Sequence, residues 1–311
     1  MTQCIREKLA LTSFGSRKIE ADFAGGRLTS DGGALLLREA DRKLGLTAAL
    51  DRAISDPRDQ RYVTHSQHTL LAQRIFGIAL GYEDLNDHDE MRKDPALQVA
   101  VGVEEELASA PTLCRLEGRV EKDALWQMSE TLVEAFIATH TEPPQRLVLD
   151  FDATDDPLHG MQEGRFFHGY YDHYCYLPLY VFCGDKLLVA YLRPSGIDPA
   201  LHSRAILKML TRWFRREWPG VEIIARGDSD FARHRTMHWC ENNEVGYIFG
   251  LRRNRVLERK AGPWRELARE GVEATGQTQR VFGQFRYAAG TWKRDRRVIV
   301  KAEHMRRGPN T

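Results

Sequence analysis

Residues 147–194 read LVLDFDATDDPLHGMQEGRFFHGYYDHYCYLPLYVFCGDKLLVAYLRP, and this stretch decides the fold. Three apolar runs typical of strands occur in it, at residues 147–154, 176–184 and 186–194. Gly184 and Asp185 between the last two runs are a tight-turn signal. The pattern predicts one strand, then a loop, then an antiparallel hairpin.

The chain that follows alternates between helix and strand patterns. An amphipathic helix is expected over 199–218, a strand over 221–230, a second helix over 231–243 and a last strand over 245–251. A hairpin trio followed by helix-linked parallel strands is the order of the ribonuclease H-like fold. A doubly wound nucleotide-binding fold would place a helix directly after its first strand. The predicted fold class is therefore α/β (α+β) with a mixed, ribonuclease H-like sheet.

The flanking stretches have different patterns. Upstream, apolar residues at helical spacing predict a helical bundle, including one long helix over 116–140 after a break at Ala110-Pro111. Downstream, a short helix is expected near PWRELARE, and then a hairpin in which Lys and Arg alternate with aromatic residues. The expected domain boundaries are 1–29, 30–142, 143–254 and 255–311.

The formal net charge of +1 hides a strong asymmetry. Residues 1–200 carry a net charge of −11, and residues 201–311 carry +12. A basic segment with interleaved aromatic residues suits nucleic acid, where cations meet phosphates and rings meet bases. Ordinary solvated charges and half-buried strand residues explain the same pattern equally well.

Composition excludes several classes of protein. A content of 42% hydrophobic and 29% charged residues is typical of a globular chain rather than a disordered one. No apolar run reaches the length of a membrane helix, and the first residues lack the pattern of a signal peptide. Five scattered Cys without a Cys-x-x-Cys pair fit a reducing compartment. We therefore expect a cytoplasmic protein with no membrane association.

Carboxylates at strand ends are the candidate catalytic residues. Asp150 and Asp152 lie two apart near the end of a buried strand, and Asp228 ends another strand. Strand-end carboxylates brought together in an open sheet can hold Mg²⁺ or Mn²⁺, which prefer oxygen ligands. Such ions support phosphodiester chemistry. Taken alone, each residue has a simpler interpretation: Asp152 would form a turn, and Asp228 would cap the next helix.

A second reaction class fits the same motif. LVLDFDAT also matches the D-x-D-x-T opening of haloacid dehalogenase-like phosphatases. Asp150 would then be the nucleophile and Asp152 the general acid and base. The hairpin after the first strand and the basic, aromatic third stretch argue against this alternative.

Several long motifs resemble the insertion sequence 1380 family of DDE transposases. They include LTSDGGALLLREADRKLGL, GYEDLNDHDEMRKDP, DATDDPLHG and TWKRDRRVIVKAEH, and the resemblance runs from about residue 28 to the last residues. It implies a ribonuclease H-like core interrupted by a β-rich insertion. It also implies an Asp-Asp-Glu triad that uses Mg²⁺ to cut and join DNA at terminal inverted repeats.

The resemblance assigns residues and partners. It places the first two acids, catalytic and metal-binding, on Asp152 and Asp228, with Asp150 and Asp230 as possible neighbours; Asp230 stands where the family usually has Gly. The DNA-binding residues expected in the basic stretch are Arg252, Arg253, Arg255, Lys293, Arg294, Arg296 and Arg297. The expected partners are double-stranded inverted-repeat and target DNA, bound by a homo-oligomer on the bacterial nucleoid.

The third acid has no match. In the family it lies on a helix beyond the insertion, and no segment here resembles that helix. Glu266 and Glu270 lie on a short expected helix and are interpreted as solvated residues, and Glu303 lies in a strand. We therefore expect a C-terminally truncated copy in which 30–142 is a helical DNA-binding or assembly domain, 143–254 is the first part of the catalytic core and 255–311 is an incomplete insertion. Such a copy would be impaired in cleavage, or an inactive DNA-binding fragment that inhibits a full-length copy.

Overall fold

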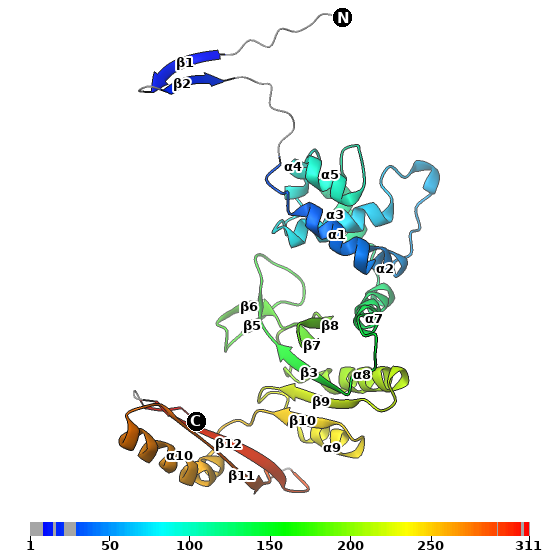
Figure 1. Cartoon of the computed structure of the whole chain (residues 1–311). Helices are drawn as coiled ribbons and strands as arrows, with labels where there is room; N and C mark the ends of the chain where they lie inside the picture. Colours follow the sequence, from blue (N-terminus) through cyan, green and yellow to red (C-terminus); the bar gives the residue numbers. More distant parts are fainter. Residues whose placement is uncertain (1–8, 15–16, 22–28, 291, 306–307, 311) are drawn as a thin grey trace, which may run out of the picture. The chain divides into compact units, whose positions relative to one another are not determined.

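The computed structural model describes residues 9–14, 17–21, 29–290, 292–305 and 308–310 (Figure 1). The chain divides into two compact units, residues 1–139 and 140–311. The fold is mixed α and β, as the sequence predicts. No helix among the described residues is long and apolar enough to cross a membrane.

The first unit is mainly helical. Its strands form a hairpin, β1 (Leu9–Phe14) and β2 (Arg17–Ala21). Its helices are α1 (Ala34–Leu44), α2 (Leu46–Arg52), the 3₁₀ turn η1 (Gln60–Tyr62), α3 (Gln67–Ala79), α4 (Asp87–Met91), α5 (Pro95–Val101), α6 (Ala110–Glu117) and α7 (Lys122–Ala138).

Local sequence signals explain where these helices start and stop. The Ser66 side chain accepts a hydrogen bond from the Thr69 N–H, and Asp94 accepts one from the Leu97 N–H. Gly45 closes α1 at a φ of +64°, which glycine adopts without strain. The helix predicted over 116–140 is shorter than expected: α7 begins at Lys122, and residues 116–117 belong to the end of α6. Pro111 lies in the first turn of α6 rather than breaking a helix, and α6 ends at Gly118.

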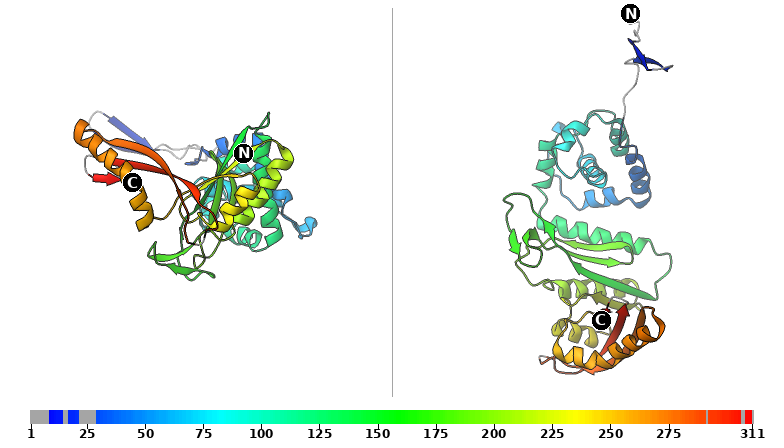
Figure 2. Two further views of the ribbon diagram at one scale, coloured as in Figure 1. Left: turned by 90° about the horizontal axis from the view of Figure 1, so that it is seen from below. Right: turned by 90° about the vertical axis from the view of Figure 1, so that its left-hand side faces the viewer.

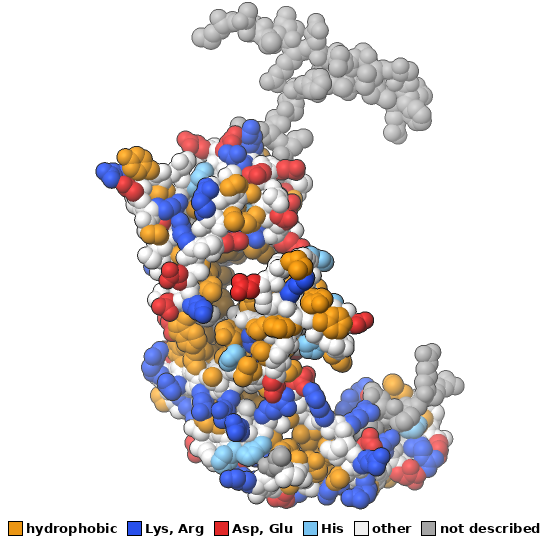
Figure 3. All heavy atoms as spheres, turned by 180° about the vertical axis from the view of Figure 1, so that it is seen from behind, with side chains coloured by type: hydrophobic (Ala, Val, Ile, Leu, Met, Phe, Trp, Pro, Cys, Tyr) orange, Lys and Arg blue, Asp and Glu red, His pale blue; other side chains and the backbone are white. Residues whose placement is uncertain are grey.

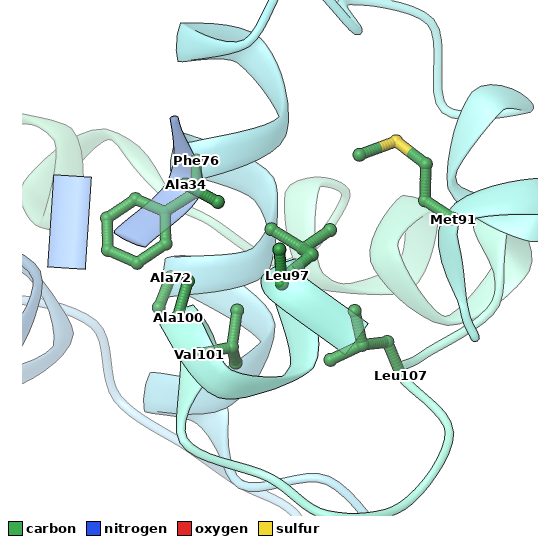
Figure 4. Packing of buried hydrophobic residues seen from close by; sticks show 9 residues of the cluster. Ala34, Ala72, Phe76, Met91, Leu97, Ala100, Val101 and Leu107 are labelled. Atoms are coloured by element: carbon green, nitrogen blue, oxygen red, sulfur yellow. The ribbon is translucent and has the colours of Figure 1, made fainter. Parts of the chain in front are cut away.

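The largest hydrophobic cluster of this unit joins α1, α3 and α5 (Figure 4). Phe76 and Leu97 are fully or almost fully buried in it, together with Ala34 from α1. The buried His88 ring lies against Gly77, where a Cβ atom would be 2.5 Å from the ring. α1, α3 and α5 therefore each bury apolar side chains inside the unit, as in a bundle.

The second unit contains the predicted mixed sheet. Its strands are β3 (Arg146–Ala153), β7 (Leu179–Cys183), β8 (Lys186–Tyr191), β9 (Glu222–Gly227) and β10 (Gly246–Phe249). Their order is β10-β9-β3-β7-β8. β3, β7 and β8 pair antiparallel, and β9 and β10 add parallel strands on the other side of β3. This is the topology expected from the hairpin trio and the helix-linked strands.

Two helices cover one face of this sheet. α8 (Ser203–Glu217) links β8 to β9, and α9 (His234–Asn242) links β9 to β10 (Figure 2). Phe151 of β3, Leu207 of α8 and Thr236 of α9 line one small packing gap, so both helices lie on the face that carries Phe151. Since side chains alternate along a strand, Asp150 and Asp152 lie on the opposite face.

Two smaller sheets complete the unit. β4 (Asp156–Pro157), β5 (Phe166–His168) and β6 (His173–Tyr176) form a sheet where the sequence predicted a loop. β11 (Gln279–Tyr287), β12 (Arg296–Met305) and β13 (Gly308–Asn310) form the other. The long helix α10 (Arg255–Thr275) packs on it, where only a short helix was expected. The Asn254 side chain caps α10 well before Pro263, which lies inside the helix.

Candidate active site

The pairing of β3 with β9 brings the two candidate carboxylates together. Asp150 pairs with Arg226, and Phe151 pairs with Gly227. Asp152 and Asp228 are the next residues on these parallel strands, which lie about 4.8 Å apart. Both are exposed. The structure thus places the two candidate carboxylates side by side at the carboxyl ends of adjacent strands.

The Asp150 carboxylate forms an ion pair with Arg226 on the neighbouring strand. Its carboxylate accepts two hydrogen bonds from the Arg226 guanidinium, of which the Nη2–Oδ2 bond is 2.6 Å long. These hydrogen bonds raise the pKa of Arg226 above its usual range. A carboxylate held in a bidentate pair is a poor ligand for a metal ion. Asp150 therefore differs from Asp152, which lies on the same face of the sheet and is exposed.

The turn after β9 holds Asp228 in place. Asp228 Oδ1 accepts a hydrogen bond of 2.8 Å from the Asp230 N–H, which is the geometry of an Asx turn. Asp230 itself forms an ion pair with Arg252. The Gly250 N–H donates to Gly227 O at 3.1 Å, so the end of β10 supports the same turn.

Gly250 allows this close backbone approach. A Cβ atom there would lie 2.9 Å from Ser229 N and 3.1 Å from the carbonyl carbon of Asp228. We expect Gly250→Ala to displace the turn and to destabilise the protein by about 1–3 kcal/mol, as overpacking does. Urea unfolding measures this loss. Gly262→Ala is the matched control, because no atom lies within 4 Å of a Cβ atom there. Equal stability of the two variants would contradict the assigned role of Gly250.

A small polar cluster lies close to Asp152. His173 Nε2 is 2.8 Å from Asp155 Oδ2. Burial raises the pKa of Tyr171, and the negative charges of Asp155 and Asp152 raise it further. The β4-β6-β5 sheet thus brings imidazole and phenol groups to the edge of the candidate site.

Arg193 fixes the segment beside that sheet. It is only 1% exposed, and it donates hydrogen bonds to three backbone carbonyls, those of Leu177 (2.9 Å), Pro199 (3.0 Å) and Leu201 (2.7 Å). Burial lowers the pKa of its guanidinium. The roles of Arg193, Arg226 and Gly250 were not predicted from the sequence. A single Arg beside Pro194 was the only signal for the first, and nothing local marked the other two.

The cations predicted to bind DNA have different environments. Arg296 is 7% exposed, and its Nε donates to Glu241 Oε1 at 2.7 Å. Arg294 lies 2.9 Å from Glu241 Oε2, and Arg252 is paired with Asp230. Arg296 is buried, whereas the other predicted residues are exposed: Arg252, Arg253, Arg255, Lys293, Arg294 and Arg297.

The comparisons with known proteins identify the family. Residues 11–311 match the family model described as transposase DDE domain group 1. The chain belongs to this family. The cryo-electron microscopy structure of the piggyBac transposase synaptic complex with hairpin DNA is similar, with 13% sequence identity and a TM-score of 0.36. That similarity covers 86% of this chain, and the chain spans 60% of the length of that protein. No curated protein matches significantly.

The described part of this DDE-domain chain supplies two strand-end carboxylates rather than three. Among the described residues, no group of three or more His, Cys, Asp or Glu side chains is arranged to hold a metal ion. Glu266 and Glu270 are exposed on α10, as expected of solvated residues, and Glu266 pairs with Arg269. Glu303 is buried in β12 and pairs with Arg280.

Proposed function

We propose that this chain is a DNA transposase of the insertion sequence 1380 family, with Asp152 and Asp228 as its first two catalytic acids. The register of β3 and β9 carries the proposal, because it leaves two exposed carboxylates next to each other at adjacent strand ends. The substrate would be double-stranded DNA at terminal inverted repeats, cleaved by hydrolysis and then joined to target DNA by 3′-hydroxyl attack.

The two carboxylates fit a hard divalent cation. Both are exposed, and neither forms an ion pair within the described residues. DDE transposases generally use divalent metal ions, and oxygen ligands of this kind suit Mg²⁺ or Mn²⁺. When bound, the ion would activate the attacking oxygen and stabilise the leaving oxygen. Asp152 and Asp228 would hold it, and the Asp230–Arg252 pair and Gly250 would keep the turn around Asp228 in position.

The exposed Arg and Lys side chains between residues 252 and 297 could bind a polyanion such as DNA. We propose that Arg253, Arg255, Lys293 and Arg297 contact the phosphates of bound DNA. Residues 30–142 would serve in DNA binding or assembly, 143–254 as the first part of the catalytic core, and 255–311 as part of an insertion. A homo-oligomer in the DNA complex remains part of this proposal.

We further propose that the 311-residue chain alone cleaves DNA slowly, because the described residues bring two carboxylates rather than three to the strand ends. In mixed oligomers with an active copy, such a chain would compete for DNA and inhibit. The phosphatase alternative requires Asp150 as a nucleophile, and Arg226 occupies that carboxylate.

Strand cleavage and metal binding test the proposal together. The assay uses a duplex that ends in the inverted repeat of the element, with Mg²⁺ or Mn²⁺, and calorimetry measures binding of Mn²⁺ alone. We expect Mn²⁺ binding that weakens at least about tenfold in Asp152→Asn, with any cleavage lost in parallel. Unchanged Mn²⁺ binding in that variant, or hydrolysis of a small phosphomonoester without any affinity for DNA, would overturn the proposal.

A further inference from the structure

A line of cations runs along the outer side of α8. It consists of Arg204, Lys208, Arg212 and Arg216, and we call it the α8 ridge. The residues are four apart, so they follow one stripe of the helix. The opposite stripe, which includes Leu207, Leu210 and Phe214, is buried against the sheet. Figure 3 shows Lys and Arg side chains gathered over α8, with His side chains over α9 beside them.

The ridge cations are not neutralised inside the protein. In the described part of the chain, none of the four forms an ion pair with a carboxylate. This differs from Arg146, Lys186 and Arg286, which pair with Glu222, Asp185 and Asp295. Four adjacent unpaired cations repel one another, which favours a polyanion as the partner.

Two tryptophan rings support the ridge. Lys208 Nζ lies 5.8 Å from the centre of the Trp239 ring of α9, and the Arg216 guanidinium lies 5.8 Å from that of Trp213. Such cation–π contacts hold the long side chains near the helix surface. The surface therefore offers positioned positive charge.

The dimensions of the ridge fit a duplex. Arg204 and Arg216 are twelve residues apart, which is about 18 Å along a helix axis. Duplex DNA rises about 3.4 Å per base pair, so the ridge matches roughly five base pairs of backbone.

The ridge lies on the other side of the sheet from the candidate catalytic residues. α8 and α9 cover the face that carries Phe151, whereas Asp152 follows on the opposite face. A straight duplex at the carboxylates therefore does not also lie along α8.

We infer that the α8 ridge binds the backbone of a second segment of duplex DNA, distinct from the segment at Asp152 and Asp228. This inference rests on the proposed function, because it takes DNA to be the polyanion. Recognition through phosphates alone makes the binding independent of sequence.

The test replaces three ridge residues, Arg204→Gln, Lys208→Gln and Arg212→Gln, in the full chain. Each lost phosphate contact lowers the slope of log affinity against log salt by about 0.9. For a duplex without an inverted repeat, we expect the slope to fall by about 2–3 and the affinity at low salt to fall at least about tenfold. In a capture assay, the variant should retain a biotinylated inverted-repeat duplex but lose the second, fluorescent duplex that the wild type carries with it.

The matched control removes the same charge at paired positions, with Arg146→Gln, Lys186→Gln and Arg286→Gln. It should keep both the salt slope and the capture of the second duplex. Equal effects in the two triple variants, unchanged capture in the ridge variant, or a slope that falls only for single-stranded RNA would each overturn the inference. The ridge variant in an Asp152→Asn background separates the two proposals, because the ridge effect persists there even if metal-dependent cleavage is absent in every protein.

Discussion

Replacing Asp228 by Asn is expected to lower the rate of metal-dependent DNA cleavage by about 10³-fold, equivalent to about 4 kcal/mol in the barrier. The substitution removes one of the two exposed carboxylates at the ends of β3 and β9 but keeps the shape of the side chain. The amide oxygen still accepts the Asp230 N–H hydrogen bond, so the turn should survive. Cleavage of a labelled inverted-repeat duplex measures the rate, and Mn²⁺ calorimetry reports the same loss where cleavage is slow.

Asp150→Asn is the matched comparison on the same face of the sheet. Because Asp150 is already paired with Arg226, its loss should change the cleavage rate by less than about tenfold. The opposite ranking, with Asp150 essential and Asp228 dispensable, would support the phosphatase-like mechanism and contradict the transposase assignment. The pair of variants therefore separates two reaction classes that the D-x-D-x-T motif alone leaves open.

The second large effect concerns the attachment of β12 to α9. Glu241 of α9 accepts hydrogen bonds from Arg296 Nε at 2.7 Å and from the Tyr247 hydroxyl at 2.8 Å. Arg296 also lies over the Trp292 ring, at 4.8 Å from its centre. Glu241→Ala would leave this buried guanidinium without its carboxylate. We expect a loss of about 3 kcal/mol in the free energy of unfolding, measured by urea denaturation.

The same contact makes stability depend on pH. Burial acts to raise the pKa of Glu241, but hydrogen bonds from Arg296 and Tyr247 and the charges of Arg296 and Arg294 outweigh it and lower the pKa below 4.5. A lowered pKa in the folded state stabilises the protein above the unfolded-state pKa, and this contribution disappears as the pH falls through the folded-state value. The wild type should therefore lose stability below about pH 4.5 more steeply than Glu241→Ala.

Glu266→Gln provides the control for both measurements. Glu266 is exposed and pairs with Arg269 one turn along α10. The Glu266→Gln variant should keep the urea midpoint of the wild type and its dependence of stability on pH below about 4.5. An equally unstable Glu266→Gln, or a stable Glu241→Ala, would show that the α9–β12 contact is not a major source of stability.

Local pattern predicted most of the second unit. The apolar run at 147–154 forms β3, and the Gly184-Asp185 turn joins β7 to β8 as expected. α8 and α9 lie where amphipathic spacing placed them. These elements are decided by short-range periodicity and turn residues, which a single sequence displays. The strand directions then followed from the connections: β7 and β8 are joined without a helix and pair antiparallel, and β9 and β10 are joined through α9 and pair parallel.

Other elements depend on contacts between distant residues, and the sequence did not reveal them. The short strands β4, β5 and β6 have little apolar alternation and form through pairing with one another. The length of α10 was underestimated because Pro263 suggested a helix start. The helix is instead capped by Asn254, in the loop that follows β10.

The candidate site was predicted in part. The positions of Asp152 and Asp228 at strand ends follow from the pattern, and the register of β3 with β9 adds their proximity. The pairing of Asp150 with Arg226 and the burial of Arg296 could not be predicted, because each partner is far away in the sequence. Basic residues look alike in a sequence, and only the fold separates those that join segments from those that face solvent.

The Asp150–Arg226 pair has a consequence for how this site can change over time. It lies on the same two strands, two residues before the exposed carboxylates, and it cancels the charge of a third acid on the same face. Loss of Arg226 alone would leave three neighbouring negative charges, and loss of Asp150 alone would add an uncompensated positive charge. Replacement of Asp150 should therefore be tolerated more readily than replacement of Arg226, since only the loss of Arg226 adds negative charge beside Asp152 and Asp228.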